Sequence, residues 1–162
     1  MNKLKTVFVD RDGVINQERS DYVKSISELE IYPNVAKNIK LLKDAGFLVI
    51  VITNQSAVNR GIITHEMINQ IHNSIQDHLK KYGTFLDGFY YCPHTPDENC
   101  NCRKPKSGLL EKAILELNVD LNSSWMIGDS DSDIEAADSV GCKAIKISDS
   151  FSLDNAVEKI LN

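Results

Sequence analysis

The stretch Val7-Phe8-Val9-Asp10-Arg11-Asp12-Gly13-Val14-Ile15-Asn16 decides the fold of this chain. Its first three residues are aromatic or β-branched and predict a short buried strand, which ends abruptly at two carboxylates. In an open α/β sheet, ligands bind at the carboxyl ends of the strands, so Asp10 and Asp12 occupy a place where chemistry is usual. Two acids this close repel each other, and both stay ionised most easily beside a cation such as Mg²⁺.

Two other interpretations of Asp10 and Asp12 compete with a magnesium site. The acids could simply begin a turn, as Asp often does. An EF-hand calcium loop also begins Asp-x-Asp, but it requires Gly at its sixth position and Glu at its twelfth, where this chain has Ile15 and Asp21. Calcium is therefore a poor fit.

The composition is that of an ordinary globular protein. A length of 162 residues with 42% hydrophobic residues allows one domain, residues 1–162, with a full core. The net charge of −5 argues against nucleic acid or an anionic membrane as the main partner. The longest strongly apolar run, residues 47–52, is far too short to span a bilayer, so we expect a cytoplasmic protein.

Apolar strands alternate with amphipathic helices along the chain. After residues 7–9, strands are expected at 47–52, 89–91, 125–127 and 143–147, and helices at 34–45, 64–82, 108–117, a segment ending near 140, and 153–161. This alternation predicts an open, mostly parallel α/β sheet with helices on both faces.

Two of these strands are followed by polar residues, Thr53-Asn54-Gln55-Ser56 in one case and Gly128-Asp129 in the other. Parallel strands end at the same edge of a sheet, so Thr53 and Asp129 should lie near Asp10.

A second metal site is indicated by two ligand pairs, Cys-x-His and Cys-x-Cys, which are separated by five residues. The candidate ligands are Cys92, His94, Cys100 and Cys102. Zn²⁺ takes such ligands tetrahedrally, and four protein ligands leave no open position for water, so the site should be structural. Cysteines gathered by chance are the less favoured alternative at this spacing.

Several neighbouring residues are interpreted from their context. Arg103-Lys104 follows the last zinc ligand, and a rigid loop would hold both cations in fixed directions, which suits a phosphate better than a solvated charge run. Cys142 lies in an apolar segment and should simply be packed. His65, His72 and His78 have no ligand-like partners, and we expect them at surface or boundary positions of a helix.

Four ordered motifs resemble those of the haloacid dehalogenase superfamily of phosphotransferases. They are Asp10-x-Asp12-Gly13, Thr53 after the second strand, Lys104, and Gly128-Asp129 with Asp133. More narrowly, the segments 10–16, 53–56, Cys92-Pro93-His94 and Cys100-x-Cys102-Arg103-Lys104-Pro105 are similar to the subfamily that contains phosphatases of heptose bisphosphates and of histidinol phosphate. The resemblance implies a Rossmann-like fold with a zinc-stapled loop, and both early connections are too short for a large cap domain.

The resemblance also implies a mechanism. Asp10 would attack phosphorus to give an aspartyl-phosphate, and Asp12 would protonate the leaving oxygen and then activate water. Thr53, Lys104 and Mg²⁺ would hold the phosphoryl oxygens. The metal would be bound by Asp10, Asp129 and the backbone carbonyl of Asp12, while Asp133 would orient its neighbours. The expected substrate-binding residues are Arg11, Glu18, Tyr22, Asn54, Gln55, Ser56, Arg60 and Arg103.

The substrate implied by the resemblance is a small phosphorylated metabolite, in the first place a heptose 1,7-bisphosphate cleaved at its 7-phosphate by a monomeric enzyme. Histidinol phosphate is the alternative, because the five residues between His94 and Cys100 are close to the histidinol-phosphate pattern, whereas Asn16 and Arg60-Gly61 resemble the heptose enzymes. A zinc-stapled binding module without catalysis is the competing class. Such a module would lack the nucleophile, the acid or the lysine, but Asp10, Asp12 and Lys104 are all present.

Overall fold

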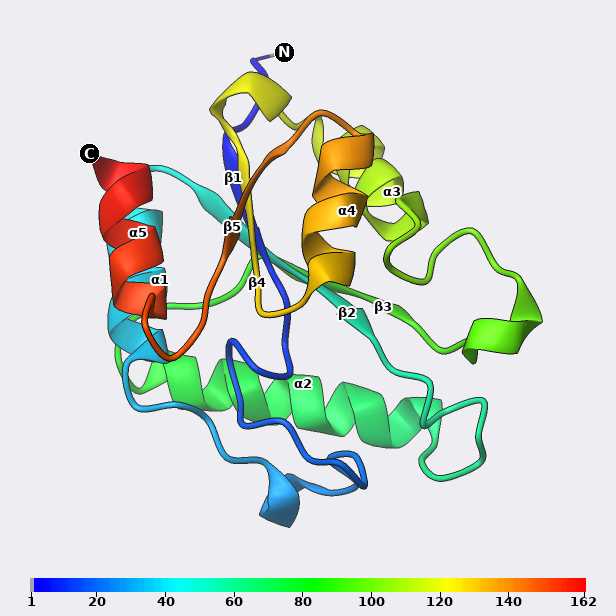
Figure 1. Ribbon diagram of the computed structural model, residues 1–162. Coiled ribbons are helices and arrows are strands. Elements are labelled where there is room, and N and C mark those ends of the chain that lie inside the picture. Colours follow the sequence, from blue (N-terminus) through cyan, green and yellow to red (C-terminus); the bar gives the residue numbers. More distant parts are fainter. Residues whose placement is uncertain (1) are drawn as a thin grey trace.

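The computed structural model describes residues 2–162 and contains a five-stranded parallel sheet in the order β3-β2-β1-β4-β5 (Figure 1). The strands are β1 (Thr6–Val9), β2 (Leu48–Asn54), β3 (Gly88–Cys92), β4 (Trp125–Gly128) and β5 (Lys143–Lys146). The α-helices are α1 (Val35–Asp44), α2 (His65–Lys80), α3 (Gly108–Leu117), α4 (Asp131–Ser139) and α5 (Leu153–Leu161). Short 3₁₀ turns are η1 (Ile26–Glu28), η2 (Pro96–Glu98) and η3 (Leu121–Ser123).

Side chains alternate between the two faces of the sheet, so each strand contributes to two separate layers of core. In β1, Val7 and Val9 belong to the cluster that contains buried residues of α1, α2 and α5, whereas Phe8 belongs to the cluster with α3 and α4. Figure 1 shows α1 and α5 on one side of the sheet and α3 and α4 on the other. The predicted α/β fold with helices on both faces is confirmed.

The start of α2 shows how the sequence sets a helix boundary. The side chain of Thr64 accepts a hydrogen bond of 3.1 Å from the N–H of Met67, which satisfies one of the free donors of the first turn. From there Ile68, Ile71 and Ile75 face inward and are fully buried.

Strand bounds shift by one or two residues, and one histidine differs from the sequence expectation. β2 continues to Asn54, because Thr53 and Asn54 still pair with Tyr91 and Cys92 of β3. The expected surface or boundary position is wrong for His72, whose side chain is buried.

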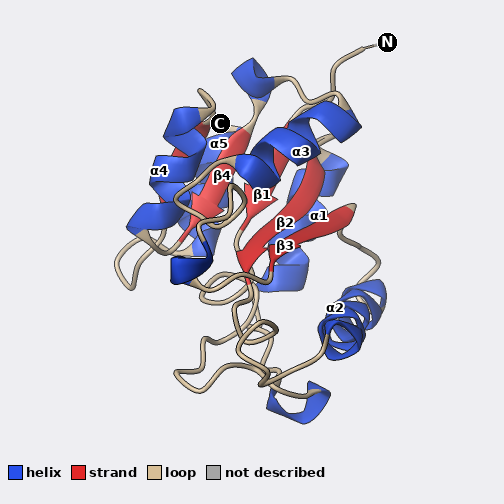
Figure 2. Ribbon diagram, turned by 90° about the vertical axis from the view of Figure 1, so that its right-hand side faces the viewer, coloured by secondary structure: helices blue, strands red, loops and turns tan. Residues whose placement is uncertain are grey.

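The sheet brings three chain segments to one edge. β1 lies between β2 and β4, and the strand order reverses beside β1, which in open α/β sheets opens a crevice beyond the carboxyl ends. Asp10 follows β1, Thr53 lies near the end of β2, and Asp129 follows β4. Loops gather at this edge, below the strands in Figure 2.

The connections from β1 to α1 and from β2 to α2 contain, within residues 2–162, no α-helix and no strand. The carboxyl edge therefore faces solvent without a covering domain in this part of the chain. Among the helices of the same residues, none has the length and apolarity that a bilayer crossing requires.

Candidate active site

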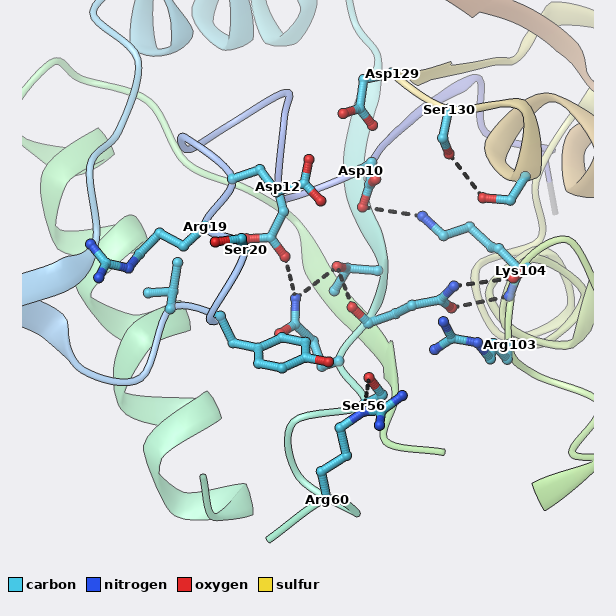
Figure 3. A pocket seen from close by; sticks show the side chains of 17 residues that line it. Asp10, Asp12, Arg19, Ser20, Ser56, Arg60, Arg103, Lys104, Asp129 and Ser130 are labelled. Carbon is cyan, nitrogen blue, oxygen red and sulfur yellow. Dashed lines mark hydrogen bonds and ion pairs between the residues drawn. The ribbon is translucent and has the colours of Figure 1, made fainter. Parts of the chain in front are cut away.

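A cavity of about 430 Å³ opens at the carboxyl edge of the sheet (Figure 3). It brings together nearly all the residues that the sequence singled out for phosphate chemistry and substrate binding. These are Asp10, Asp12, Glu18, Tyr22, Thr53, Asn54, Gln55, Ser56, Arg60, Arg103, Lys104 and Asp129. The substrate-binding candidate that does not line it is Arg11.

Five further lining residues were not singled out: Arg19, Ser20, Val23, Ser130 and Ser132. The first three lie in or beside the segment 18–22. Because Glu18 and Tyr22 of this segment were expected to contact the substrate, their neighbours could have been included. The two serines belong to the start of α4. A serine at this position is typical of a helix cap, so the sequence pattern did not indicate a binding site.

Lys104 is a buried cation held between two carboxylates. Its Nζ donates to Oδ1 of Asp133 at 2.6 Å and to the carbonyl oxygen of Ile52 at 2.7 Å, and it lies 3.1 Å from Oδ1 of Asp10. Burial alone would lower the pKa of Lys104, but the charges of Asp10 and Asp133 raise it above its usual value. Lys104 therefore stays positively charged beside Asp10.

Asp10, Asp129 and Asp133 form a cluster whose carboxylate oxygens lie within 4.8 Å of one another. Burial raises the pKa of Asp10 to about 7, against the opposing charge of Lys104. Burial and the charge of Asp133 also raise the pKa of Asp129. Three acids in so little space are the arrangement that a divalent cation stabilises.

Asp133 has both oxygens engaged by the protein. Oδ1 pairs with Lys104, and Oδ2 accepts from the N–H groups of Asp129 and Ser130 at 3.1 and 3.2 Å. Among the described residues, this leaves the carboxylate of Asp129 and Oδ2 of Asp10 for a cation. Hard carboxylate oxygens suit Mg²⁺, so the residues present fit the expected metal.

Gly13 allows Asp129 to approach the loop that carries Asp10 and Asp12. Its φ of 86° lies in the left-handed region, and a Cβ at this position would overlap the carboxylate of Asp129. The Gly of the first motif is therefore required both by its backbone conformation and by the close approach.

Asp12 is held by three donors. Nη2 of Arg11 donates to Oδ1 at 3.0 Å, Nδ2 of Asn16 donates to the same oxygen at 2.9 Å, and Nε2 of Gln55 donates to Oδ2 at 2.7 Å. Its carboxylate is therefore fixed in direction at the wall of the cavity. A fixed direction is what an acid/base group needs, since proton transfer depends on geometry.

Asn54 lines the cavity, but both polar atoms of its side-chain amide form hydrogen bonds with the protein main chain. Oδ1 accepts from the N–H of Lys104 at 3.0 Å, and Nδ2 donates to the carbonyl oxygen of Lys104 at 3.1 Å. The two bonds join the end of β2 to the main chain of the lysine. Thr53 in turn accepts from Nε2 of Gln55 at 3.0 Å.

Arg11 does not occupy the position expected of a substrate-binding residue. Its side chain is 1% exposed and pairs with Asp12. The side chain of Arg11 therefore contacts Asp12 and not the cavity, and the substrate contact expected for this residue stays a prediction for its backbone alone. The sequence pattern could not distinguish the two, because a cation next to a catalytic motif serves either purpose.

The mouth of the cavity carries three arginines. Arg19, Arg60 and Arg103 line it, together with the acid Glu18, whose pKa is raised by burial and by Asp129. Nη1 of Arg103 donates to the carbonyl oxygen of His94 at 3.2 Å, so the cysteine-rich loop sets the direction of this cation. Arginines in fixed directions suit phosphate oxygens.

The cysteine and histidine ligands predicted for the second metal lie together beside the cavity. The Sγ atoms of Cys92 and Cys102 are 3.1 Å apart, those of Cys92 and Cys100 are 3.6 Å apart, and Nδ1 of His94 lies 3.2 Å from Sγ of Cys102. A tetrahedral Zn²⁺ with Zn–S bonds of about 2.3 Å would place its sulfurs about 3.8 Å apart. The four side chains can therefore hold a metal ion, and the donor set fits zinc.

Comparisons with known proteins agree with this geometry. A family model described as "HAD-hyrolase-like" matches residues 101–159. A D-glycero-beta-D-manno-heptose-1,7-bisphosphate 7-phosphatase of Neisseria meningitidis serogroup A is 39% identical over 140 residues, which cover 86% of this chain and 75% of that protein. A protein of the same name from Helicobacter pylori strain 26695 is 42% identical over 137 residues, covering 84% and 79%. This chain belongs to the haloacid dehalogenase-like phosphatases.

A solved structure from the same phosphatase family supports the assignment of the cavity. The D,D-heptose 1.7-bisphosphate phosphatase of B. bronchiseptica, complexed with magnesium and phosphate, has a TM-score of 0.91 and 30% identity, with 98% of each chain covered. That protein binds the two ligands for which the acids and Lys104 of this chain are suited.

The raised pKa of Asp10 predicts how stability depends on pH without a divalent cation. An acid whose pKa is about 7 in the folded protein and 3.8 otherwise favours the unfolded state increasingly as pH rises between those values. In Mg²⁺-free buffer, the margin by which the melting temperature of Asp10→Asn exceeds or falls below that of the wild type should therefore shift in favour of the variant from about pH 4 to about pH 7 and be constant above it. Thermal unfolding followed by circular dichroism measures the margin.

The matched control is Asp138→Asn, which removes an exposed carboxylate of α4. It should melt like the wild type at every pH. Added Mg²⁺ should raise the melting temperature of the wild type more than that of Asp10→Asn. A margin independent of pH would contradict the buried, repelled state of Asp10.

Proposed function

We propose that the protein is a Mg²⁺-dependent phosphomonoesterase that works through an aspartyl-phosphate on Asp10. The observation that carries the proposal is the position of Asp10, whose carboxylate lies 3.1 Å from the ammonium of Lys104 and lines the same cavity as Asp12. The nucleophile, the acid/base and the cation for the phosphoryl group are thereby within reach of one phosphate. Membership of the phosphatase family supports the same reaction.

In the first step, a carboxylate oxygen of Asp10 forms a bond to phosphorus and the bond to the leaving oxygen breaks, while Asp12 gives that oxygen a proton. In the second step, Asp12 takes a proton from water, the water oxygen bonds to phosphorus, and the bond to Asp10 breaks to release phosphate. Lys104 and Thr53 stabilise the charge on the phosphoryl oxygens. Asp10, Asp129 and the backbone carbonyl of Asp12 would hold Mg²⁺, which would neutralise further charge and keep Asp10 ionised.

Replacing either proposed catalytic acid tests this mechanism. Asp10→Asn and Asp12→Asn should each lower Mg²⁺-dependent phosphate release by about a thousandfold or more, because the one removes the nucleophile and the other the proton donor. Phosphate release and circular dichroism should be measured on the same preparations. Near-normal turnover by either folded variant would contradict the mechanism.

We further propose that Cys92, His94, Cys100 and Cys102 bind a structural Zn²⁺. Although burial opposes a thiolate at Cys100, backbone hydrogen bonds from Arg103 and Cys102 lower the pKa of this thiol to about 7, which supports metal binding. Four protein ligands close the coordination shell, so the metal would hold the loop rather than react. Through the contact of Arg103 with His94, it would also hold the arginine at the cavity mouth.

Metal analysis of protein purified without added zinc should give about one zinc per chain. Cys100→Ser should lose zinc and melt lower, and its activity should fall because Arg103 loses its anchor. The matched control is Cys142→Ser, which changes a buried cysteine outside the cluster and should keep its zinc. Full zinc occupancy in Cys100→Ser would show that the ligands are wrong.

For the substrate we propose a sugar bisphosphate, in the first place D-glycero-D-manno-heptose 1,7-bisphosphate cleaved at the 7-phosphate. The names of the similar proteins support it, and the arginines at the cavity mouth suit a second phosphate. The alternative, histidinol phosphate, would need acids around its cationic amine. Glu18 is such an acid at the cavity mouth, but it lies there together with Arg60 and Arg103, whereas Asp21 is paired with Arg19 and Lys24.

The remaining features of the proposal follow from the size and charge of the chain. Residues 1–162 would act as one catalytic domain and as a cytoplasmic monomer on a small metabolite. The net charge of −5 supports the absence of nucleic acid and anionic membrane among its partners.

The substrate proposal is tested by comparing kcat/KM for the heptose bisphosphate and for histidinol phosphate, since this ratio reports differential transition-state binding. We expect a preference of at least about tenfold for the bisphosphate, which corresponds to about 1.4 kcal/mol from the second phosphate. The opposite preference would assign histidinol phosphate and leave the phosphatase mechanism standing.

A further inference from the structure

Arg11 is a buried cation whose partners lie on two opposite sides. Towards the cavity, Nη2 donates to both oxygens of Asp12, at 3.0 and 3.3 Å. Away from it, Nη1 lies 3.4 Å from Nε2 of His72. Among the described residues, Nε has no hydrogen-bond partner. Unpaired donors of a buried guanidinium are costly, so the contact with His72 supplies the polar partner on the far side.

The ring of His72 packs against two aromatic rings of β3. Its ring stacks on Phe89 of β3 with centroids 4.3 Å apart and an interplanar angle of 13°, and it meets the ring of Tyr91 edge-on at 5.9 Å. Arginine only donates, so Nε2 must be the acceptor nitrogen and the ring proton must lie on Nδ1. Burial and the charge of Arg11 lower the pKa of His72 to about 3, which agrees with a neutral ring.

We propose that His72 is a positioning residue for the acid/base step: Nε2 of His72 holds the guanidinium of Arg11, which in turn holds the carboxylate of Asp12. The inference rests on the acid/base role proposed for Asp12. Of the three donors to Asp12, Arg11 alone is charged; Asn16 belongs to the same loop as Asp12, and Gln55 follows β2. Without Nε2, the guanidinium would turn towards another acceptor and Asp12 would lose its fixed direction.

The kinetic signature is a dependence on the leaving group. A sugar alkoxide needs a proton as the bond to phosphorus breaks, so its release depends on where Asp12 is held. p-Nitrophenolate is a stable anion and leaves without protonation. Asp12 also activates water in the second step, which is the same for both substrates, so the comparison uses kcat/KM, which covers only the steps up to release of the leaving group. A loss of general packing would lower kcat/KM of both substrates alike, whereas a misplaced Asp12 lowers that of the sugar phosphate selectively.

The test variant is His72→Phe, which keeps an aromatic ring against Phe89 and removes the acceptor nitrogen. For the heptose bisphosphate we expect kcat/KM to fall about tenfold or more, and for p-nitrophenyl phosphate we expect kcat/KM to fall less than about threefold. His72→Gln, which again offers an acceptor, should recover part of the loss. The matched control His78→Phe makes the same change on α2 at a residue that does not line the cavity, and it should behave as wild type.

Equal losses on the two substrates, or no loss, would overturn the role of His72. A wild type that releases phosphate from neither ester would instead overturn the proposed function. The contact with Arg11 is tested separately in the wild type, by nitrogen-15 NMR of labelled histidine. We expect Nε2 of His72 to be unprotonated and Nδ1 protonated at neutral pH, and a protonated Nε2 would exclude the inference even if His72→Phe failed to fold.

Discussion

The buried ammonium of Lys104 is the interaction on which the rest of the site depends. A cation that is 4% exposed requires negative partners, and it takes them from Asp10 after β1 and Asp133 in α4. Asp133 also caps the helix that follows β4, so the same carboxylate joins helix initiation to the charge of the lysine. Three segments that are distant in sequence are thereby held at the edge where the strand order reverses.

Much of this arrangement could be predicted from the sequence, because it follows from regular patterns. Apolar runs and helical stripes identified all five strands and all five α-helices, and the parallel order brings their carboxyl ends together. The ligand spacing identified the Cys92 to Cys102 cluster, which the structure brings into contact. These features were predicted correctly because residue type and spacing are enough to define them.

Side-chain pairings that depend on tertiary partners could not be predicted. His72 lies four residues after Ile68 and three before Ile75, a position on the buried stripe of α2, but a polar side chain there is interpretable only once Arg11 is known to face it. Similarly, nothing in the sequence shows that Asn54 bonds the main chain of Lys104, fifty positions away. Pairings between distant segments are set by the folded chain, so residue type alone could not define the roles of His72 and Asn54.

The uncovered carboxyl edge has a consequence for what else could accept the phosphoryl group. Since the two early connections of residues 2–162 contain no strand and no α-helix, an aspartyl-phosphate on Asp10 would lie in a cavity that stays open to solvent. Small alcohols at high concentration would then compete with water for the same phosphorus atom, and Asp12 could deprotonate either. The division of product between free phosphate and new phosphate esters would thus be governed by the composition of the solvent rather than by the motion of a lid.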